Sequence, residues 1–130
     1  METMTGLERA VVNKLVAGKA EVFRVLRQQV SVAQVLKREL SGVGFFTEFS
    51  VPPDAPRLPG SPTFRFGDVG AEIKGLQHGA GFLLLIEDGR LKMLEGFSYD
   101  EPWPDDVSSF TLHYHNGADR NEDEVIKSFD

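Results

Sequence analysis

The stretch that decides the fold is "FLLLIEDGRLKMLEGF", from Phe82 to Phe97. Two runs rich in large apolar residues flank Asp88 and Gly89. This dipeptide favours a two-residue type I′ turn between antiparallel strands. The sequence therefore predicts a tight β-hairpin, in which Glu87 faces Arg90, Ile86 faces Leu91, Leu84 faces Met93 and Phe82 faces Glu95.

This predicted register makes the hairpin apolar on both faces. One face is expected to carry Phe82, Leu84, Ile86, Leu91, Met93 and Phe97, and the other Leu83, Leu85 and Leu94. Strands of this kind are usually central in a sheet and covered on both sides. We expect helices on one face. The other face needs to be covered by the proline-rich loop, the C-terminal tail or a second subunit. If a second subunit covers it, a homodimer is the simplest assembly.

The residues before the hairpin predict two helices and a further pair of strands. Thr5 and Glu8 have capping-box spacing, and apolar residues four apart predict a helix over 6–17. A second helical pattern covers 19–29. Residues 30–36 fit either a continuation of this helix or a strand. Alternating apolar residues on both sides of "SGVG" then predict another β-hairpin.

The rest of the chain predicts shorter elements. Residues 52–62 hold five prolines in eleven positions, which a strand ladder does not tolerate. Further strands are expected at "TFRF", at 71–76 and in "SFTLHYH". A short helix is expected from Asn121, with docking side chains at Val125, Ile126 and Phe129. Two helices followed by five or six mostly antiparallel strands predict a single α+β domain over 1–130, with the helices packed on the sheet.

Composition narrows the function classes. The chain has a net charge of −6 and no cysteine, which excludes disulfides, thiolate metal sites and cysteine nucleophiles. An acidic chain disfavours nucleic acid as a partner, because phosphate binding needs a basic patch. No apolar run approaches the roughly 20 residues that cross a bilayer. We expect a cytoplasmic protein with no membrane partner and no cofactor.

Three stretches carry a resemblance to known proteins: Arg38–Pro52, Gly75–Leu91 and Leu94–Pro104, the last reading "LEGFSYDEPWP". Together they are similar to a group of small bacterial proteins that have no assigned function. The resemblance covers about the last two thirds of the chain. It implies no catalytic residue, cofactor or partner.

The first candidate site is the acidic-aromatic loop that holds Tyr99, Asp100, Glu101 and Trp103. Its acids do not have the spacing of a calcium loop, and a stiff connector between strands is the alternative interpretation. Two prolines flank Trp103 and fix its ring, and fixed aromatic rings are common on recognition surfaces. The leading hypothesis is a non-enzymatic binding module whose partner is an unknown protein or small molecule.

The second candidate site is a pair of histidines. His113 and His115 are two residues apart on a predicted strand and so face one side, which is half of a zinc or iron site. A third ligand would come from His78, Glu72 or Glu95. The alternative function is therefore a small metal-dependent or hydrolytic enzyme, and the competing interpretation is a polar edge strand.

The third candidate is an ion pair between Arg38 and Glu95. The predicted hairpin register directs Glu95 toward an apolar layer, and Arg38 shares a predicted face with Leu36 and Leu40. A charge on an apolar face needs a partner. The sequence therefore predicts that Arg38 and Glu95 pair, as a structural contact or as part of a binding site.

Overall fold

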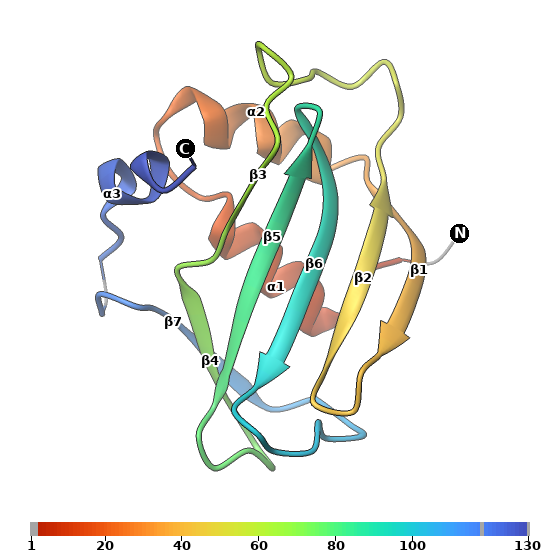
Figure 1. The fold of residues 1–130 in the computed structure, drawn as a ribbon, viewed down its shortest axis with the longest axis vertical. Helices are drawn as coiled ribbons and strands as arrows, with labels where there is room; N and C mark the ends of the chain where they lie inside the picture. The colour runs from red at the N-terminus through yellow and green to blue at the C-terminus, as the bar shows by residue number, and fades with distance from the viewer. Residues whose placement is uncertain (1–2, 118, 130) are drawn as a thin grey trace.

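The structure is a computed structural model that describes residues 3–117 and 119–129. These residues form three helices and seven strands: α1 (Gly6–Leu15), α2 (Glu21–Val30), β1 (Gln34–Leu40), β2 (Gly44–Ser50), β3 (Phe64–Phe66), β4 (Val69–Ile73), β5 (Ala80–Glu87), β6 (Arg90–Ser98), β7 (Phe110–Tyr114) and α3 (Glu122–Lys127). The strands form one antiparallel sheet in the order β1-β2-β6-β5-β4-β7, with β3 also paired to β5 (Figure 1). The α+β fold is confirmed, with seven strands instead of five or six.

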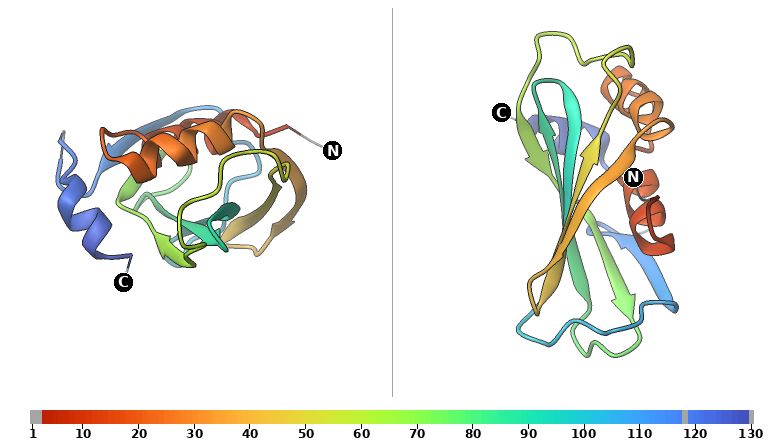
Figure 2. Two further views of the ribbon diagram at one scale, coloured as in Figure 1. Left: turned by 90° about the horizontal axis from the view of Figure 1, so that it is seen from above. Right: turned by 90° about the vertical axis from the view of Figure 1, so that its right-hand side faces the viewer.

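Helices α1 and α2 lie against one face of the sheet (Figure 2). The capping box is present, because Thr5 Oγ1 accepts from the Glu8 backbone N–H and a Glu8 carboxylate oxygen accepts from the Thr5 N–H. The segment that fitted helix or strand contains both: α2 ends at Val30, a turn follows, and β1 begins at Gln34. Both helices bury an apolar stripe against the sheet, as amphipathic helices do.

The central hairpin has a β-bulge that the sequence prediction lacked. Glu87 faces Arg90 and Ile86 faces Leu91 as predicted, but Leu85 then faces Met93, so Lys92 is an extra residue on β6. A bulge of one residue moves every later side chain of that strand to the opposite face. The predicted pairs Leu84–Met93 and Phe82–Glu95 are therefore wrong, and the observed pairs are Leu84–Leu94 and Leu83–Glu95.

The bulge also changes which residues lie on the second face. Leu94 is fully buried on the helix side of the sheet, so the predicted patch of Leu83, Leu85 and Leu94 does not exist. Leu83 and Leu85 are half-buried on the opposite face. No described segment covers that face in front of the central strands (Figure 1), so the described parts of the proline-rich loop and the C-terminal tail do not provide the expected cover.

A buried glutamine joins α2 to the end of the hairpin. Gln29 is fully buried, and its amide donates to the carbonyls of Gly89 (2.9 Å) and Pro56 (2.8 Å). Its side-chain oxygen accepts from the Leu91 N–H at 2.7 Å. Asp88 and Gly89 have φ of 52° and 75°, as the predicted type I′ turn requires. The Gln29 side chain thus links α2, the proline-rich loop and the end of the hairpin.

The C-terminal segment docks beside the start of α2. Helix α3 has Asn121 as its N-cap, and Val125, Ile126 and Phe129 pack against the core as predicted. The Arg120 guanidinium binds both carboxylate oxygens of Asp68 (2.8 and 2.9 Å) and lies 4.4 Å from the centre of the Phe23 ring. The Glu122 carboxylate accepts from the N–H groups of Lys19 and Ala20 and so joins α3 to the segment directly before α2, about a hundred positions earlier in the chain.

The described helices are all short. Among the residues that the structure describes, no helix is both long enough and apolar enough to cross a membrane.

Candidate functional site

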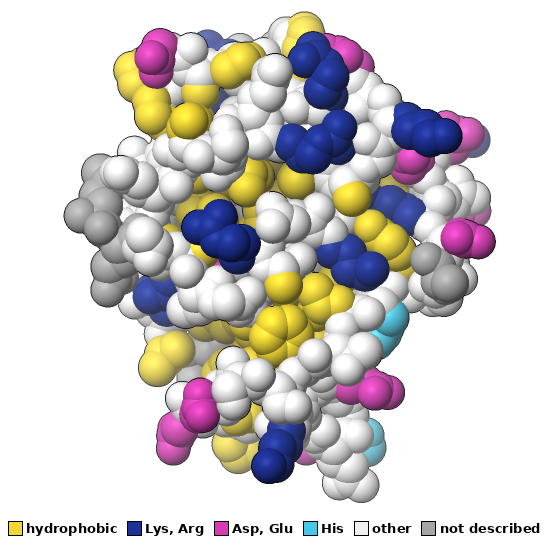
Figure 3. All heavy atoms as spheres, turned by 180° about the vertical axis from the view of Figure 1, so that it is seen from behind, with side chains coloured by type: hydrophobic (Ala, Val, Ile, Leu, Met, Phe, Trp, Pro, Cys, Tyr) yellow, Lys and Arg dark blue, Asp and Glu magenta, His cyan; other side chains and the backbone are white. Residues whose placement is uncertain are grey.

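A cleft of about 600 Å³ opens where α1 begins, between the turn joining β1 to β2 and the loop that follows β6. We call it the Trp103 cleft. Its apolar wall consists of Leu7, Leu40, Phe45, Trp103, Pro104 and Val107. Seen from the helix-bearing side, hydrophobic side chains gather between the helices and the loop end of the sheet (Figure 3). A volume of this size lies within the range of ordinary ligand sites.

A carboxylate and a guanidinium lie together in the cleft. The Arg38 side chain, 24% exposed, binds Glu8, only 2% exposed, through two N–O contacts of 2.7 Å. The hydroxyl of the buried Thr47 donates to the same carboxylate at 2.5 Å. Burial alone would raise the pKa of Glu8, but the hydrogen bonds from Arg38, Thr47 and Thr5 outweigh it and lower this pKa below 4.5. Glu8 is therefore a fixed negative charge at neutral pH.

Trp103 is held in place by its backbone and its ring. Its backbone N–H donates to the Gly42 carbonyl at 2.8 Å, and this bond ties the loop to the β1–β2 turn. The indole meets the Phe45 ring edge-on, with 5.4 Å between ring centroids. Edge-to-face contacts of this kind are favourable beyond the area they bury. Trp103 is half-buried, so part of its ring is available to a ligand in the cleft.

The loop that carries Trp103 is fastened at its start by Glu101. The Glu101 carboxylate accepts from the backbone N–H groups of Gln77 (2.8 Å) and His78 (2.9 Å). These two bonds lower the pKa of Glu101, and the Ser98 hydroxyl bonds the Glu101 backbone on the same turn. Glu101 thus joins two loops at this end of the sheet and does not line the cleft.

The remaining predicted residues divide between the cleft and other surfaces. Arg38 and Trp103 both line the cleft, whereas Tyr99 and Asp100 are exposed outside it. The predicted pair of Arg38 with Glu95 is wrong. Arg38 faces Thr47, which faces Leu94, so Arg38 is on the helix side, and the bulge places Glu95 beside Leu83 on the opposite face.

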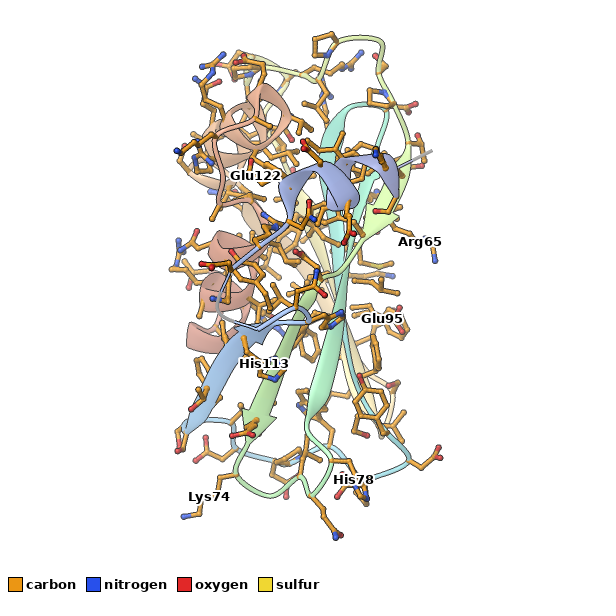
Figure 4. All side chains as sticks on the ribbon, turned by 90° about the vertical axis from the view of Figure 1, so that its left-hand side faces the viewer. Arg65, Lys74, His78, Glu95, His113 and Glu122 are labelled. Atoms are coloured by element: carbon orange, nitrogen blue, oxygen red, sulfur yellow. The ribbon has the colours of Figure 1, made fainter. Side chains whose placement is uncertain are left out.

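The histidines do not form a cluster. His113 lies on the edge strand β7 with its ring over Gly70, and His115 follows it. Figure 4 shows His78 at the loop end of the sheet and Glu95 projecting from the face opposite the helices, away from His113. Among the described residues, no group of three or more His, Asp or Glu side chains could hold a metal ion. The metal hypothesis therefore lacks its third ligand there.

Sequence reasoning missed Glu8, Phe45 and Val107 as parts of the site. Glu8 was found only as a helix-capping residue, and a capping pattern carries no sign that the same carboxylate also binds an arginine on a strand. Phe45 was found only as one residue of an alternating strand. Comparison of the chain with protein-family models, with curated proteins and with solved structures finds no match.

Proposed function

We propose that the protein is a non-enzymatic binding module whose Trp103 cleft receives an extended protein segment with apolar and positively charged side chains. The observation that carries this proposal is the composition of the cleft. An apolar wall lies beside the ion pair of Glu8 and Arg38, and two further carboxylates, Asp105 and Asp106, belong to its lining.

The sign of the ligand charge follows from the charges in the cleft. Glu8 offsets the charge of Arg38, while Asp105 and Asp106 are exposed and form no ion pair among the described residues. The lining therefore has a net negative charge. A lysine or arginine of a partner would be attracted to these carboxylates and could also lie against the face of Trp103. This supports a basic, apolar ligand over an anionic one.

The cleft also supports binding over catalysis. Its buried carboxylate already accepts four hydrogen bonds, from Thr5, Arg38 and Thr47, so it is poorly suited to accept a proton from a substrate. A general base works best with a pKa near the operating pH, and the pKa of Glu8 is lowered. The contacts around Glu8 instead give a rigid floor, which reduces the ordering cost of binding.

Fluorescence of Trp103, the only tryptophan, tests the proposal directly. The probes are three blocked hexapeptides that alternate Lys with Leu, Glu with Leu, or Lys with Ser. We expect only the Lys–Leu peptide to give a saturable change in emission. Replacing Asp105 and Asp106 with Asn should weaken its binding about fivefold, the scale expected for two exposed charge contacts.

Matched variants separate the cleft from the general surface. Asp100→Asn removes an exposed acid of the same loop that lies outside the cleft and should leave binding unchanged. Leu40→Ser should weaken binding, whereas Val32→Ser, at an exposed position before the same strand and outside the cleft, should not. Equal binding of the Lys–Leu and Glu–Leu peptides would refute the proposed charge preference. Equal effects of the paired variants would refute the proposed location.

Three further expectations from the sequence belong to the same proposal. We place the protein in the cytoplasm, which suits a chain without cysteine. We keep the resemblance to small bacterial proteins as a prediction about its relatives. We also keep the homodimer, although not its predicted surface, because Leu94 is buried beneath the helices.

A further inference from the structure

One edge of the sheet is unusually apolar. Strand β1 is an end strand of the sheet order, and the described residues form no strand beyond it. Five large hydrophobic residues are exposed in the described part of the chain. Two of them, Leu36 and Leu40, lie on β1, and Val32 and Val43 lie in the turns that precede and follow it. Leu40 is 77% exposed and Leu36 is 51% exposed, so this edge offers apolar contacts along its length.

The opposite edge has a different character. The exposed side chains of β7 are Thr111 and His113, with His115 directly after it, while its apolar residues are half-buried toward the core. An edge strand that presents polar side chains resists pairing with another chain. The two ends of the sheet therefore differ, and β1 is the one that suits a partner.

The charges on β1 are complementary to themselves in one register. Lys37 and Glu39 are both exposed on the same face, with 3.1 Å between the Lys37 amine and the Glu39 carboxylate. If a second β1 runs antiparallel about a two-fold axis at position 38, Lys37 of each copy faces Glu39 of the other. Leu36 then faces Leu40 in both places. A shift of the axis to position 37 or 39 would instead oppose two like charges, which is unfavourable.

A protective interpretation of this edge fits less well. Edge strands are often guarded by charges and by bulges, and β1 has a bulge at Leu36, between Val35 and Lys37. Yet its two outward charges are of opposite sign and cancel. Lys37 and Glu39 therefore favour one register of an added strand and do not repel every strand that approaches. The guanidinium at position 38 is offset by Glu8, so two copies of it at the axis do not carry their full repulsion.

We propose that a second copy of this chain pairs antiparallel with β1 about a two-fold axis at position 38, so that the sheet continues across a homodimer. Symmetric two-fold pairing is the commonest closed assembly. Because Leu40 also lines the Trp103 cleft, Leu36 of the second copy would lie at the border of that cleft. The dimer would then extend the wall of each binding site.

Charge reversal tests the pairing. Lys37→Glu and Glu39→Lys each oppose like charges at two places, and we expect each to weaken the dimer about tenfold in sedimentation or light scattering over a concentration series. The double variant Lys37→Glu with Glu39→Lys restores both opposite pairs and should recover the dimer. An equimolar mixture of the two single variants should form a heterodimer. Both residues are exposed, so thermal unfolding should change little.

The absence of cysteine in the chain allows a test of the register. Lys37→Cys and Glu39→Cys should form a disulfide with each other when mixed and oxidised, and far less when each is oxidised alone. A wild-type protein that stays monomeric at several hundred micromolar would overturn the proposal. So would a dimer that ignores the single reversals or a double variant that fails to recover. Peptide binding in the cleft is measured separately by Trp103 fluorescence, so a failure of the dimer can be distinguished from a failure of the proposed cleft.

Discussion

At the scale of single residues, Glu8 joins the first helix to the sheet. It caps α1 together with Thr5, binds Arg38 of β1 and accepts from Thr47 of β2. These contacts depend on one another, because removing the charge of the buried carboxylate takes an opposite charge away from the Arg38 guanidinium. The same arrangement supplies the floor of the Trp103 cleft.

We expect Glu8→Gln to lower the free energy of unfolding at pH 7 by about 2–4 kcal/mol, the scale of a broken, mostly buried ion pair. The pKa of Glu8 is lowered in the folded protein. The ionised Glu8 carboxylate therefore contributes its full stability above the ordinary pKa of 4.5, and this contribution is lost as the pH falls through the lowered value. The difference between wild type and variant should therefore narrow in acid. Urea unfolding of both proteins across this pH range measures it.

Glu21→Gln is the matched control for this change. Glu21 also has a lowered pKa, through its hydrogen bond with Arg24, but it is fully exposed on α2. Exposed pairs of this kind contribute little, because water screens them. A gap between wild type and Glu8→Gln that stayed constant in acid would contradict the role assigned to the Glu8 carboxylate.

At the scale of elements, Gln29 connects α2 to the hairpin end. Gln29→Met keeps the size of the side chain but leaves the N–H of Leu91 without its acceptor and removes one of the two donors to the Gly89 carbonyl, which keeps the Leu58 N–H. A buried polar group left unsatisfied costs roughly 1–3 kcal/mol, and we expect a loss of about this size in urea unfolding. Gln28→Met, at an exposed position of the same helix, should change stability little. Equal effects would contradict this bonding.

The hairpin turn gives a second test at this scale. Gly89 has φ of 75°, and a Cβ added there would lie 2.6 Å from Arg57 Cγ and 2.9 Å from the Leu58 carbonyl oxygen. Gly89→Ala should therefore cost about 1–3 kcal/mol in thermal or urea unfolding. Gly42 has φ of 88° but open space around it, so Gly42→Ala measures the backbone strain alone. A loss no larger than that of Gly42→Ala would show that crowding against Arg57 and Leu58 adds nothing.

The elements themselves could be read from the sequence far better than their exact pairing. The Asp88-Gly89 turn, the capping box and the docking tail helix all have local patterns, and the structure contains them. The bulge at Lys92 has no such pattern, since nothing in "RLKML" marks an extra residue. Beyond the bulge, every side chain of β6 lies on the face opposite to the predicted one, which includes Met93, Leu94 and Glu95.

At the scale of the whole molecule, the candidate site was only half predictable for a similar reason. Trp103 stood out because two prolines flank it, and Arg38 because it shares a strand face with leucines. The partner chosen for Arg38 depended on the register of a distant hairpin and was wrong. The carboxylate that does bind it is 30 residues earlier, on a helix whose packing on the sheet no local pattern specifies.

Docking of the C-terminal segment also depends on a buried ion pair. Arg120 binds Asp68 with two hydrogen bonds, donates to the Ala17 carbonyl and packs on Phe23. Arg120→Met should lower the free energy of unfolding by about 3–5 kcal/mol, because Asp68 loses its opposite charge. The double variant with Asp68→Asn should lose less than the sum of the two single changes. Additive losses in thermal unfolding would show that the two side chains are not coupled.

The contact between Glu122 and the segment before α2 has a consequence for the order in which the chain folds during synthesis. Ala20 provides no side-chain cap for α2, and the N–H groups of Lys19 and Ala20, directly before the helix, bond the carboxylate of Glu122. A nascent chain on the ribosome thus carries this segment for about a hundred residues of translation before Glu122 emerges. Contacts this distant in sequence form late. The emerging protein should therefore be most open to proteases and chaperones near residues 17–20, and that vulnerability should end once residue 122 is free to dock.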